Sequence, residues 1–399
     1  MAGRLCGVSH APADRASTRE KERLVTEWRA FFAGDVFLGG NPEAAWVSDE
    51  LVHLMRAHDI VSCNFEAPIV VPGMNPCGKV GSWLAHPPEA AQRVLETGFN
   101  VVHLANNHLC DYDEPGVAAT LSAFKGVTVL GAGLDFGSTY ALIVKAVKGV
   151  RVGLLGYGEA EFGAWIERNG IGAGYAWINN VEVDRTVGQA KQAVDVLLVQ
   201  VHAGVEEVDL PLPEWRQRYH RLIELGADAV IAHHPHVPQG WEIMDGRPVF
   251  YSLGNFRFVG ESASPQWNNG YAVSLTFRGA AFSGFEVVPL ENTTRGVALN
   301  HDPEYRQYLQ RLCRSLEEPE YGRRIDSQAL ELWSKRYWRF YRTAVLGLAW
   351  ERMRAWVPGA FGRRKSTGGL LLLHNLQSES HLWTAQRALR ILTSRRMYA

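Results

Sequence analysis

Residues 229–258 read AVIAHHPHVPQGWEIMDGRPVFYSLGNFRF. A run typical of a buried strand ends at Ala232 and passes directly into HHPH at 233–236. In open α/β sheets ligands bind beyond the carboxyl ends of the strands, and neutral imidazole is the commonest metal-binding side chain. Three histidines in four residues exceed what core packing requires, because histidine has only an intermediate tendency to be buried. The stretch therefore predicts a ligand site at which other segments converge.

The composition excludes several classes of protein. The chain has 399 residues, enough for one large α/β domain with an appended region or for two domains. Its net charge is −1, so no global charge argument supports a nucleic-acid partner. The five cysteines are scattered and form no CxxC pair, which indicates free thiols in a reducing compartment.

The N-terminal segment has no targeting pattern. Residues 1–27 mix charged and small residues without an apolar run of signal-peptide length, and we expect a mobile leader there. No stretch reaches the roughly 18 consecutive apolar residues of a transmembrane helix; GLLLL at 369–373 is too short. We therefore expect a cytoplasmic protein without an integral membrane segment. No pattern predicts the oligomeric state.

Strand and helix patterns alternate along most of the chain. Strands are expected at 29–36, 59–64, 100–105, 127–130, 141–147, 151–156, 195–201 and 228–231, and helices at 41–57, 89–97, 117–124, 181–193 and 211–225. The segments 249–252, 271–277 and 285–289 are typical of paired antiparallel strands. This order predicts layered sheets flanked by helices, in one α/β domain over residues 28–295.

The remaining residues, 296–399, have a helical pattern in which arginine alternates with aromatic residues. A basic linker is expected at 362–369 and a last amphipathic helix at 377–393. The first interpretation is a helical cap on the domain, with basic side chains lying over aromatic surface. The alternative is a basic amphipathic surface that binds a membrane or a peptide.

Donor side chains follow five of the expected strands. In chain order they are Asp35; Asn64 and Glu66; Asn107, His108 and Asp111; His202; and His234 with His236. Oxygen and nitrogen donors from several strand ends are what a divalent-metal site in a crevice requires. One cluster alone is weak evidence, but the five together favour a metal site over a purely structural role.

The motifs that carry these donors resemble a known family. GDV, NFE, ANNHLCD, HAGVE, HHPHVPQG and YSLGNF, at 34–36, 64–66, 105–111, 202–206, 233–240 and 251–256, are similar to the CapA family. That family is the capsule-type (poly-γ-glutamate) branch of the calcineurin-like metallophosphatases. The resemblance covers residues 30–260. It implies a four-layer αββα sandwich, with the leader and the helical tail outside it.

The resemblance also implies roles for individual residues. The metal, or water bound to it, would be held by Asp35, Glu66, Asn107, His202, His234 and His236. His108 with Asp111 would form the acid/base element and, with His202 and Asp35, the catalytic set. Asn64, His233 and Asn255 would support the metal ligands from behind.

Two motifs depart from those of the broader metallophosphatases. Phe37 stands where their Asp-x-His motif has histidine, and Asn64-x-Glu66 stands where they have Gly-Asp-x-x-Asp. Two-metal phosphoester cleavage needs both ions, so the sequence favours a single oxygen-rich site. Oxygen donors suit Ca²⁺, Mg²⁺ or Mn²⁺, and imidazoles suit Zn²⁺, Mn²⁺ or Fe. We expect a divalent ion and no organic cofactor.

The first functional hypothesis is an acid/base enzyme with a peptide substrate. The family includes MslH-type lasso-peptide epimerases, which invert the C-terminal residue of a ribosomal precursor peptide. This chemistry needs a base on each face of the Cα atom and an electrophile for the developing enolate. His108 with Asp111 would serve one face, and His202 or a histidine of 233–236 the other. An aromatic C-terminus such as Trp would contact Trp165, Tyr175 and Trp177, which lie in a long loop, rich in Gly, Trp and Tyr, that we expect at 158–180.

Three alternatives remain open. The chain could be a metal-dependent hydrolase of phosphoester or amide bonds, a capsule poly-γ-glutamate biosynthesis factor, or a metal-stabilised binding module without catalysis. Capsule-type members are expected at the membrane, and no anchor is visible in this sequence. That observation favours the peptide-modifying enzyme.

Overall fold

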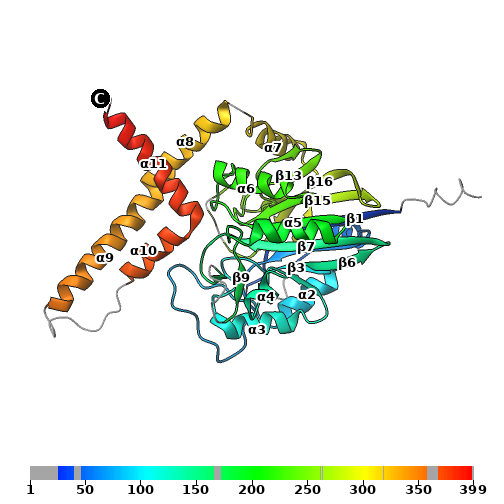
Figure 1. The fold of residues 1–399 in the computed structure, drawn as a ribbon, viewed down its shortest axis with the longest axis horizontal. Coiled ribbons are helices and arrows are strands. Elements are labelled where there is room, and N and C mark those ends of the chain that lie inside the picture. The colour runs from blue at the N-terminus through cyan, green and yellow to red at the C-terminus, as the bar shows by residue number, and fades with distance from the viewer. Residues whose placement is uncertain are drawn as a thin grey trace, which may run out of the picture.

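Two β-sheets pack face to face and carry helices on their outer faces (Figure 1). The computed structural model describes residues 26–39, 46–165, 172–260, 262, 264–317, 319–356 and 367–397. This architecture confirms the α/β class and the four-layer αββα sandwich. Of the expected leader, residues 1–25 lie outside the described part, and Glu27 already belongs to the first strand.

The larger sheet has eight strands. Its order is β17 (Gly296–Leu299), β16 (Ala281–Thr293), β15 (Asn269–Arg278), β1 (Glu27–Phe37), β2 (Ile60–Phe65), β3 (Val101–His103) and β4 (Thr128–Leu130), with β14 (Asn255–Phe258) paired to β1. Strands β1 to β4 run parallel, so their carboxyl ends lie at one edge. Every residue of β2 is buried, as expected for a parallel strand covered on both faces.

The smaller sheet has six strands, in the order β12 (Trp241–Met244), β13 (Arg247–Phe250), β11 (Ala229–His233), β10 (Val196–His202), β7 (Val150–Gly158) and β6 (Ile143–Val147). Strands β7, β10, β11 and β13 are parallel. A third, short sheet joins β5 (Ala132–Gly133), β9 (Gly174–Ala176) and β8 (Ala164–Trp165), so the loop expected at 158–180 contains two short strands.

Helices cover both outer faces of the sandwich. α1 (Asp49–Arg56), α2 (Glu89–Thr97) and α3 (Asp113–Ala123) pack on the larger sheet, and α5 (Val183–Ala193) and α6 (Pro213–Glu224) pack on the smaller one. The short α4 (Phe136–Thr139) precedes β6. Between the sheets lies a core of large side chains, among them Trp28, Phe32 and Leu198. Burial of this apolar surface is the main force that holds the layers together.

Two local expectations differ from the structure. β15 and β16 are antiparallel neighbours, as expected, but β13 lies in the other sheet, parallel to β11. The reason is a hairpin: Asp245 and Gly246 both have positive φ, the pattern of a tight Asp-Gly turn, which folds β13 back along β12. The helix expected at 41–57 begins only at Asp49, where the Ser48 side chain accepts a hydrogen bond from the Leu51 amide.

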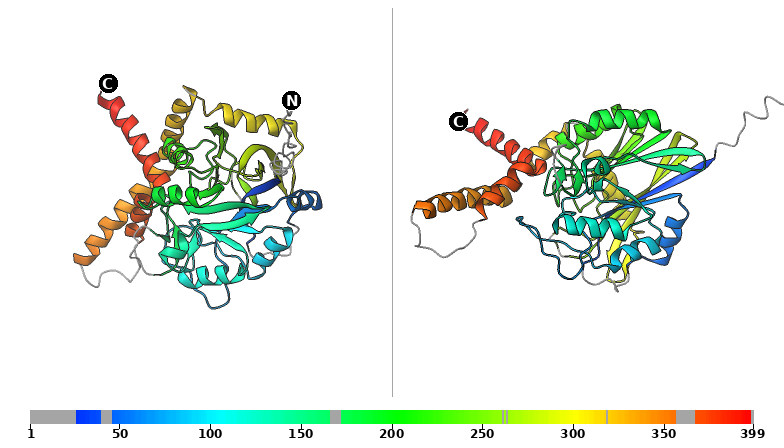
Figure 2. Two further views of the ribbon diagram at one scale, coloured as in Figure 1. Left: turned by 45° about the vertical axis from the view of Figure 1, so that its right-hand side comes forward. Right: turned by 60° about the horizontal axis from the view of Figure 1, so that its bottom comes forward.

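The C-terminal helices form an arm beside the sandwich (Figures 1 and 2). The arm consists of α8 (Glu320–Leu332), the π-helix η1 (Trp333–Tyr337), α9 (Trp338–Trp356), α10 (Gly368–Gln377) and α11 (Glu379–Met397), and α7 (Pro303–Arg314) precedes it. α7 packs on the core between the sheets, so we reserve the name helical cap for α8 to α11.

The expected boundaries of this region need adjustment. The boundary at residue 295 falls between β16 and β17, because Gly296–Leu299 pairs with β16. The single helix expected at 377–393 is preceded by another, and Ser378 separates the two. Of the linker expected at 362–369, residues 362–366 lie outside the described part, and Gly368 opens α10.

Candidate metal centre

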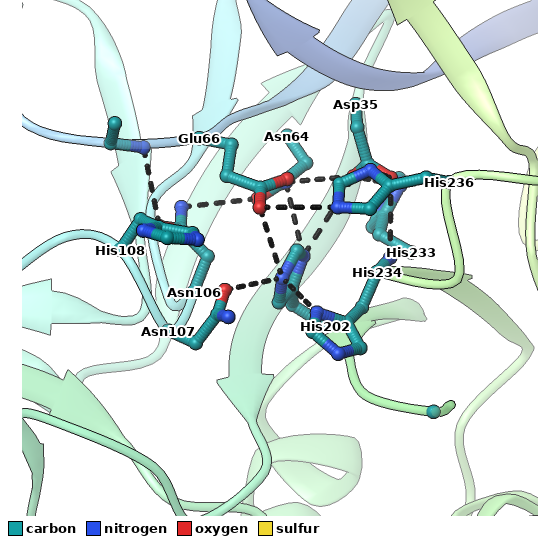
Figure 3. A network of polar contacts seen from close by, with 12 residues as sticks. Asp35, Asn64, Glu66, Asn106, Asn107, His108, His202, His233, His234 and His236 are labelled. Carbon is teal, nitrogen blue, oxygen red and sulfur yellow. Dashed lines mark hydrogen bonds and ion pairs between the residues drawn. The ribbon is translucent and has the colours of Figure 1, made fainter. Parts of the chain in front are cut away.

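The carboxyl ends of strands from both sheets bring the predicted donors together (Figure 3). Asp35 of β1 is in register with Asn64 of β2 on one side and with Asn255 of β14 on the other. In the smaller sheet, His202 at the end of β10 is in register with His233 at the end of β11. Residues far apart in the chain therefore meet at one edge of the sandwich, where α/β sheets bind ligands.

The predicted donors form two sets of three, and within each set the donor atoms lie within 4.8 Å of one another. One set is Asp35, Glu66 and His202, and the other is Glu66, His234 and His236. His236 Nδ1 is 3.4 Å from Asp35 Oδ2, and its Nε2 is 3.5 Å from Glu66 Oε1. His202 Nε2 is 3.8 Å from the same Glu66 oxygen. Glu66 thus belongs to both sets.

The backbone at HHPH is strained. His234 and His236 have φ values of +97° and +59°, a region that residues other than glycine seldom adopt. Such conformations cost roughly 1–3 kcal/mol each and persist where the surroundings impose them. Here the Asp35 carboxylate accepts a hydrogen bond from the His234 amide at 3.2 Å. The turn directs both imidazoles toward the carboxylates.

The charges of the site favour a bound cation. Burial raises the pKa of Glu66 well above its ordinary value. Burial lowers the pKa of His236, but the carboxylates of Glu66 and Asp35 outweigh it and raise that pKa to about 10. Glu66 Oε1 is buried and has no hydrogen-bond partner among the described residues, which is costly unless a ligand satisfies it. The ion-free site therefore holds protons. The carboxyl groups of Asp35 and Glu66, one of whose oxygens has no hydrogen-bond partner among the described residues, fit a divalent ion.

The remaining ligands are available as neutral donors. Burial lowers the pKa of His202 well below its ordinary value and that of His234 to about 4, so both imidazoles are neutral at pH 7, the form that binds metal ions. The Asn107 side-chain oxygen is 3.1 Å from His202 Nε2. The residues that would hold an ion are therefore Asp35, Glu66, Asn107, His202, His234 and His236.

Three further residues lie behind these ligands. Asn64 donates from Nδ2 to Asp35 Oδ1 at 2.8 Å, and Asn255 Oδ1 is 3.0 Å from His236 Nδ1. The His233 ring is fully buried, and its Nδ1 is 3.9 Å from Asp35 Oδ1. His103, which the sequence analysis did not single out, stacks on His233 with ring centroids 5.7 Å apart. Asn64 and His233 therefore lie against the Asp35 carboxylate, and Asn255 lies against the His236 ring.

His108 and Asp111 form a pair, with His108 Nδ1 2.7 Å from Asp111 Oδ2. Burial lowers the pKa of His108, although the Asp111 carboxylate acts in the opposite direction. Lys79 completes the group: its Nζ contacts Asp111 Oδ1 and lies 3.3 Å from His108 Nδ1. The sequence analysis missed Lys79 because it lies in a loop between β2 and α2 that has no periodic pattern.

Phe37 occupies the position at which the Asp-x-His motif of metallophosphatases has histidine. Its ring packs between those of His86, at 5.1 Å, and Phe258, at 5.0 Å. Phe258 in turn contacts the ring of His236, at 4.5 Å. An aromatic side chain therefore stands at the position where that motif has a potential metal ligand.

A cavity of about 430 Å³ opens beside the metal donors. Its sandwich side includes Lys79, Asn107, His108 and His236, and its aromatic and apolar side chains include Phe162, Phe258, Trp267, Phe340 and Leu371. The helical cap contributes Arg336, His374 and His381. The cavity has the size typical of ligand pockets, ~300–1,000 Å³.

The sequence analysis missed two buried acids at the edge of the donor set. Glu159 Oε1 is 3.5 Å from His234 Nε2, and donor atoms of Glu159, Glu161 and His234 lie within 4.8 Å of one another. Burial and the neighbouring Glu206 raise the pKa of Glu161 to about 7. Both acids directly follow β7, so the same strand-end reasoning could have found them.

The aromatic residues expected to bind substrate are placed differently. Tyr175 is completely buried, and its hydroxyl donates to the Glu159 carbonyl at 2.9 Å, so it shapes the loop rather than offering a surface. Trp177 donates from Nε1 to Glu379 at 3.0 Å and anchors the cap. The Trp165 side chain lies outside the part that the structure describes.

Comparison with known proteins gives a family match. Residues 29–259 match the family model described as bacterial capsule synthesis protein PGA_cap. The capsule biosynthesis protein CapA of Bacillus anthracis is 28% identical over 308 residues, which cover 72% of this chain and 74% of that protein. The PGA biosynthesis protein CapA of Bacillus subtilis is 27% identical over 281 residues, 66% of this chain and 71% of that protein.

Similar solved structures are more distant. A hypothetical protein from Thermus thermophilus has 18% identity and a TM-score of 0.41, with 66% of this chain and 99% of that one covered. A putative 5'-nucleotidase from Staphylococcus aureus has 14% identity and a TM-score of 0.43, with 72% and 58% covered. Among the residues that the structure describes, no helix has the length and apolarity needed to cross a membrane.

Proposed function

Since this chain belongs to the family of bacterial capsule synthesis proteins, PGA_cap, we propose that it is a metal-dependent acid/base enzyme that acts on a peptide. We propose that its reaction is inversion of the Cα atom of the C-terminal residue of a ribosomal lasso-type precursor peptide. The observation that supports this function is that one cavity is lined by two of the metal donors, Asn107 and His236, by His108, and by cationic and aromatic side chains.

His108 is the proposed proton-transfer residue on the sandwich side. Asp111 accepts a hydrogen bond from the backbone amide of Leu84 at 2.7 Å, which fixes the carboxylate that orients the His108 ring. A general base so placed contributes ~10²–10⁴-fold in rate. A divalent ion held by the donor set would act as a Lewis acid toward a carboxyl or carbonyl oxygen of the substrate, with Asp35 and His202 acting as its ligands.

The cavity suits a C-terminal aromatic residue. Phe258, Trp267 and Phe340 offer aromatic surface, and the ammonium group of Lys79 lies beside His108. Aromatic rings bury large apolar areas, and a cationic group favours a free carboxylate. The ligand that this combination recognises is therefore a peptide end that carries both an aromatic ring and a carboxylate.

The second candidate is a capsule poly-γ-glutamate biosynthesis factor or a hydrolase. The observation that favours it is that the similar proteins of B. anthracis and B. subtilis carry capsule and PGA biosynthesis names. The replacement of histidine by Phe37 argues against two-metal phosphoester cleavage, because that chemistry uses both ions to hold the reacting oxygens.

Stereochemical analysis tests the proposed function. Purified protein is supplied in turn with Ca²⁺, Mg²⁺, Mn²⁺ or Zn²⁺ and incubated with a synthetic peptide that ends in L-tryptophan with a free carboxylate. After acid hydrolysis, chiral chromatography should show D-tryptophan with at least one ion and none after chelation. An intact, fully L peptide with every ion, or a cleaved one, would reject the epimerase.

A further inference from the structure

The helical cap brings a second pair of histidines to the cavity. His374, on α10, and His381, on α11, line it together with His108. Their ring centroids are 5.2 Å apart in an edge-to-face arrangement. Two groups of titratable side chains from different parts of the fold therefore reach one cavity: His108 and Lys79 from the sandwich, with Asp111 behind them, and His374 with His381 from the cap.

The His374 ring is free to meet a substrate. It is half-buried, lines the cavity and has no hydrogen-bond partner within the part of the chain that the structure describes. Burial lowers its pKa, so it is a neutral base at pH 7. His381 lies deeper: its Nδ1 is buried without a partner among the described residues, and its ring is 5.0 Å from that of Tyr337. His381 thus supports His374 from the protein side.

The segment that follows His374 is tightly docked on the sandwich. Gln377 donates from Nε2 to the Glu161 carbonyl at 3.1 Å. The Glu379 carboxylate accepts from the Ala160 amide at 3.0 Å, and the Ser380 amide donates to Glu159 at 3.0 Å. These contacts hold the end of α10 against the cavity, so the position of His374 is fixed by both parts of the molecule.

The histidines of the sandwich are committed elsewhere. His202, His234 and His236 belong to the metal-donor sets, and the His233 ring is completely buried. The proposed epimerisation requires a base on each face of the Cα atom, and His108 can serve only one. His374 reaches the same cavity from another part of the fold, which makes it a candidate for the other face.

We propose that His374 is the second proton-transfer residue, an inference that rests on the proposed function. One histidine takes the Cα proton onto a ring nitrogen, and the electron pair of the C–H bond delocalises into the adjacent carboxyl group. The other histidine, protonated, gives its proton to the opposite face of the carbon. One proton leaves and one arrives, and exchange with water restores both rings.

Hydrogen exchange in deuterated water separates the two roles. The probes are two synthetic peptides that differ only in ending with L- or D-tryptophan. Wild-type protein should place deuterium on the Cα atom of both. With His374→Gln, inversion should fall at least ~10²-fold while exchange continues in one epimer only. With His108→Gln, exchange should continue only in the other epimer, because each remaining histidine reaches one face.

His301→Gln, at an exposed position, is the matched control and should behave as wild type. Thermal unfolding should show that His374→Gln and a second variant, His374→Asn, remain folded. If wild type exchanges both peptides and the folded His374 variants invert within about twofold of it, the assignment of His374 is wrong while the proposed function stands. The same conclusion follows if both histidine variants retain exchange in the same epimer. If wild type exchanges neither peptide, the proposed function and this assignment fail together.

Discussion

The two walls of the cavity are built by different means. The sandwich wall includes Asn107 and His236, and behind it Asp35, Asn64 and His202 lie at strand ends whose register is set by backbone hydrogen bonds. The cap wall includes Arg336, Phe340 and His374, and the cap reaches the sandwich through contacts such as those of the Glu379 side chain and the Ser380 amide. The sandwich wall is fixed by the sheets, and the cap wall only by docking.

This difference suggests a division of labour. Buried carboxylates and imidazoles need a rigid frame, because their charges are stabilised only at short and fixed distances. Recognition of a peptide end needs a surface that can vary without disturbing those charges. We therefore expect changes in the sandwich wall to abolish metal binding or chemistry, and changes in the cap to alter substrate affinity or stereochemical outcome.

The largest effect is expected at His108. His108→Gln should lower turnover by ~10²–10⁴-fold, because it removes a proton-transfer group, and should leave metal content unchanged. Turnover and elemental analysis on the same preparation check this. Near-native turnover in His108→Gln would show that His108 is not a proton-transfer residue.

Asp111→Ala should lower turnover too, but at an added cost of about 3–5 kcal/mol in unfolding free energy, because it leaves Lys79 without its buried partner.

Glu66→Gln should weaken metal binding more than about 100-fold, since even residues that only support ligands typically contribute 10–100-fold. The amide preserves the shape of the side chain while removing the charge that both donor sets share. Isothermal titration with the divalent ion that supports turnover measures the change. Glu207→Gln, on the cavity but outside the donor sets, is the control. Equal metal affinity in the two variants would show that Glu66 is not a metal ligand.

For each proton that is released when the metal binds, the metal affinity should rise by up to tenfold per pH unit. The pKa of His236 is raised to about 10 and that of Glu66 well above its ordinary value, so at pH 7 the ion-free site holds protons that a cation must displace. Raising the pH removes this competition. Titration at pH 6, 7 and 8, each in two buffers of different ionisation enthalpy, should show proton release. An affinity independent of pH contradicts the assignment of these ligands.

The smallest effect is expected at Arg336. Arg336 Nη2 pairs with Glu206 Oε2 at 2.6 Å and links η1 of the cap to the loop after β10. Arg336→Ala should raise KM roughly tenfold, because a hydrogen bond to a charged group contributes about that factor. We expect little change in kcat or metal content. Arg339→Ala, at an exposed position, is the control. A large loss of kcat would show that the cap takes part in assembling the metal site.

The sequence predicts the sandwich wall far better than the cap wall. Asp35 and His202 could be located because an apolar run followed by a donor marks a strand end, and parallel strands bring such ends together. His374 and Arg336 lie within helical patterns in which many polar residues are simply exposed, and only docking shows which of them face the cavity. Tyr175 shows the opposite error: an aromatic-rich loop suggested a surface, but the ring is buried.

Solvent-proton incorporation tests the central claim most directly. A peptide that ends in tryptophan is incubated with metal-loaded protein in deuterated water, and its mass and fragmentation are followed over time. We predict a gain of one mass unit on the C-terminal Cα atom without chain cleavage, and the same mixture of epimers from the L and the D peptide. Peptide fragments, or phosphate released from simple phosphoesters, without any carbon-bound deuterium would contradict this function and indicate a hydrolase.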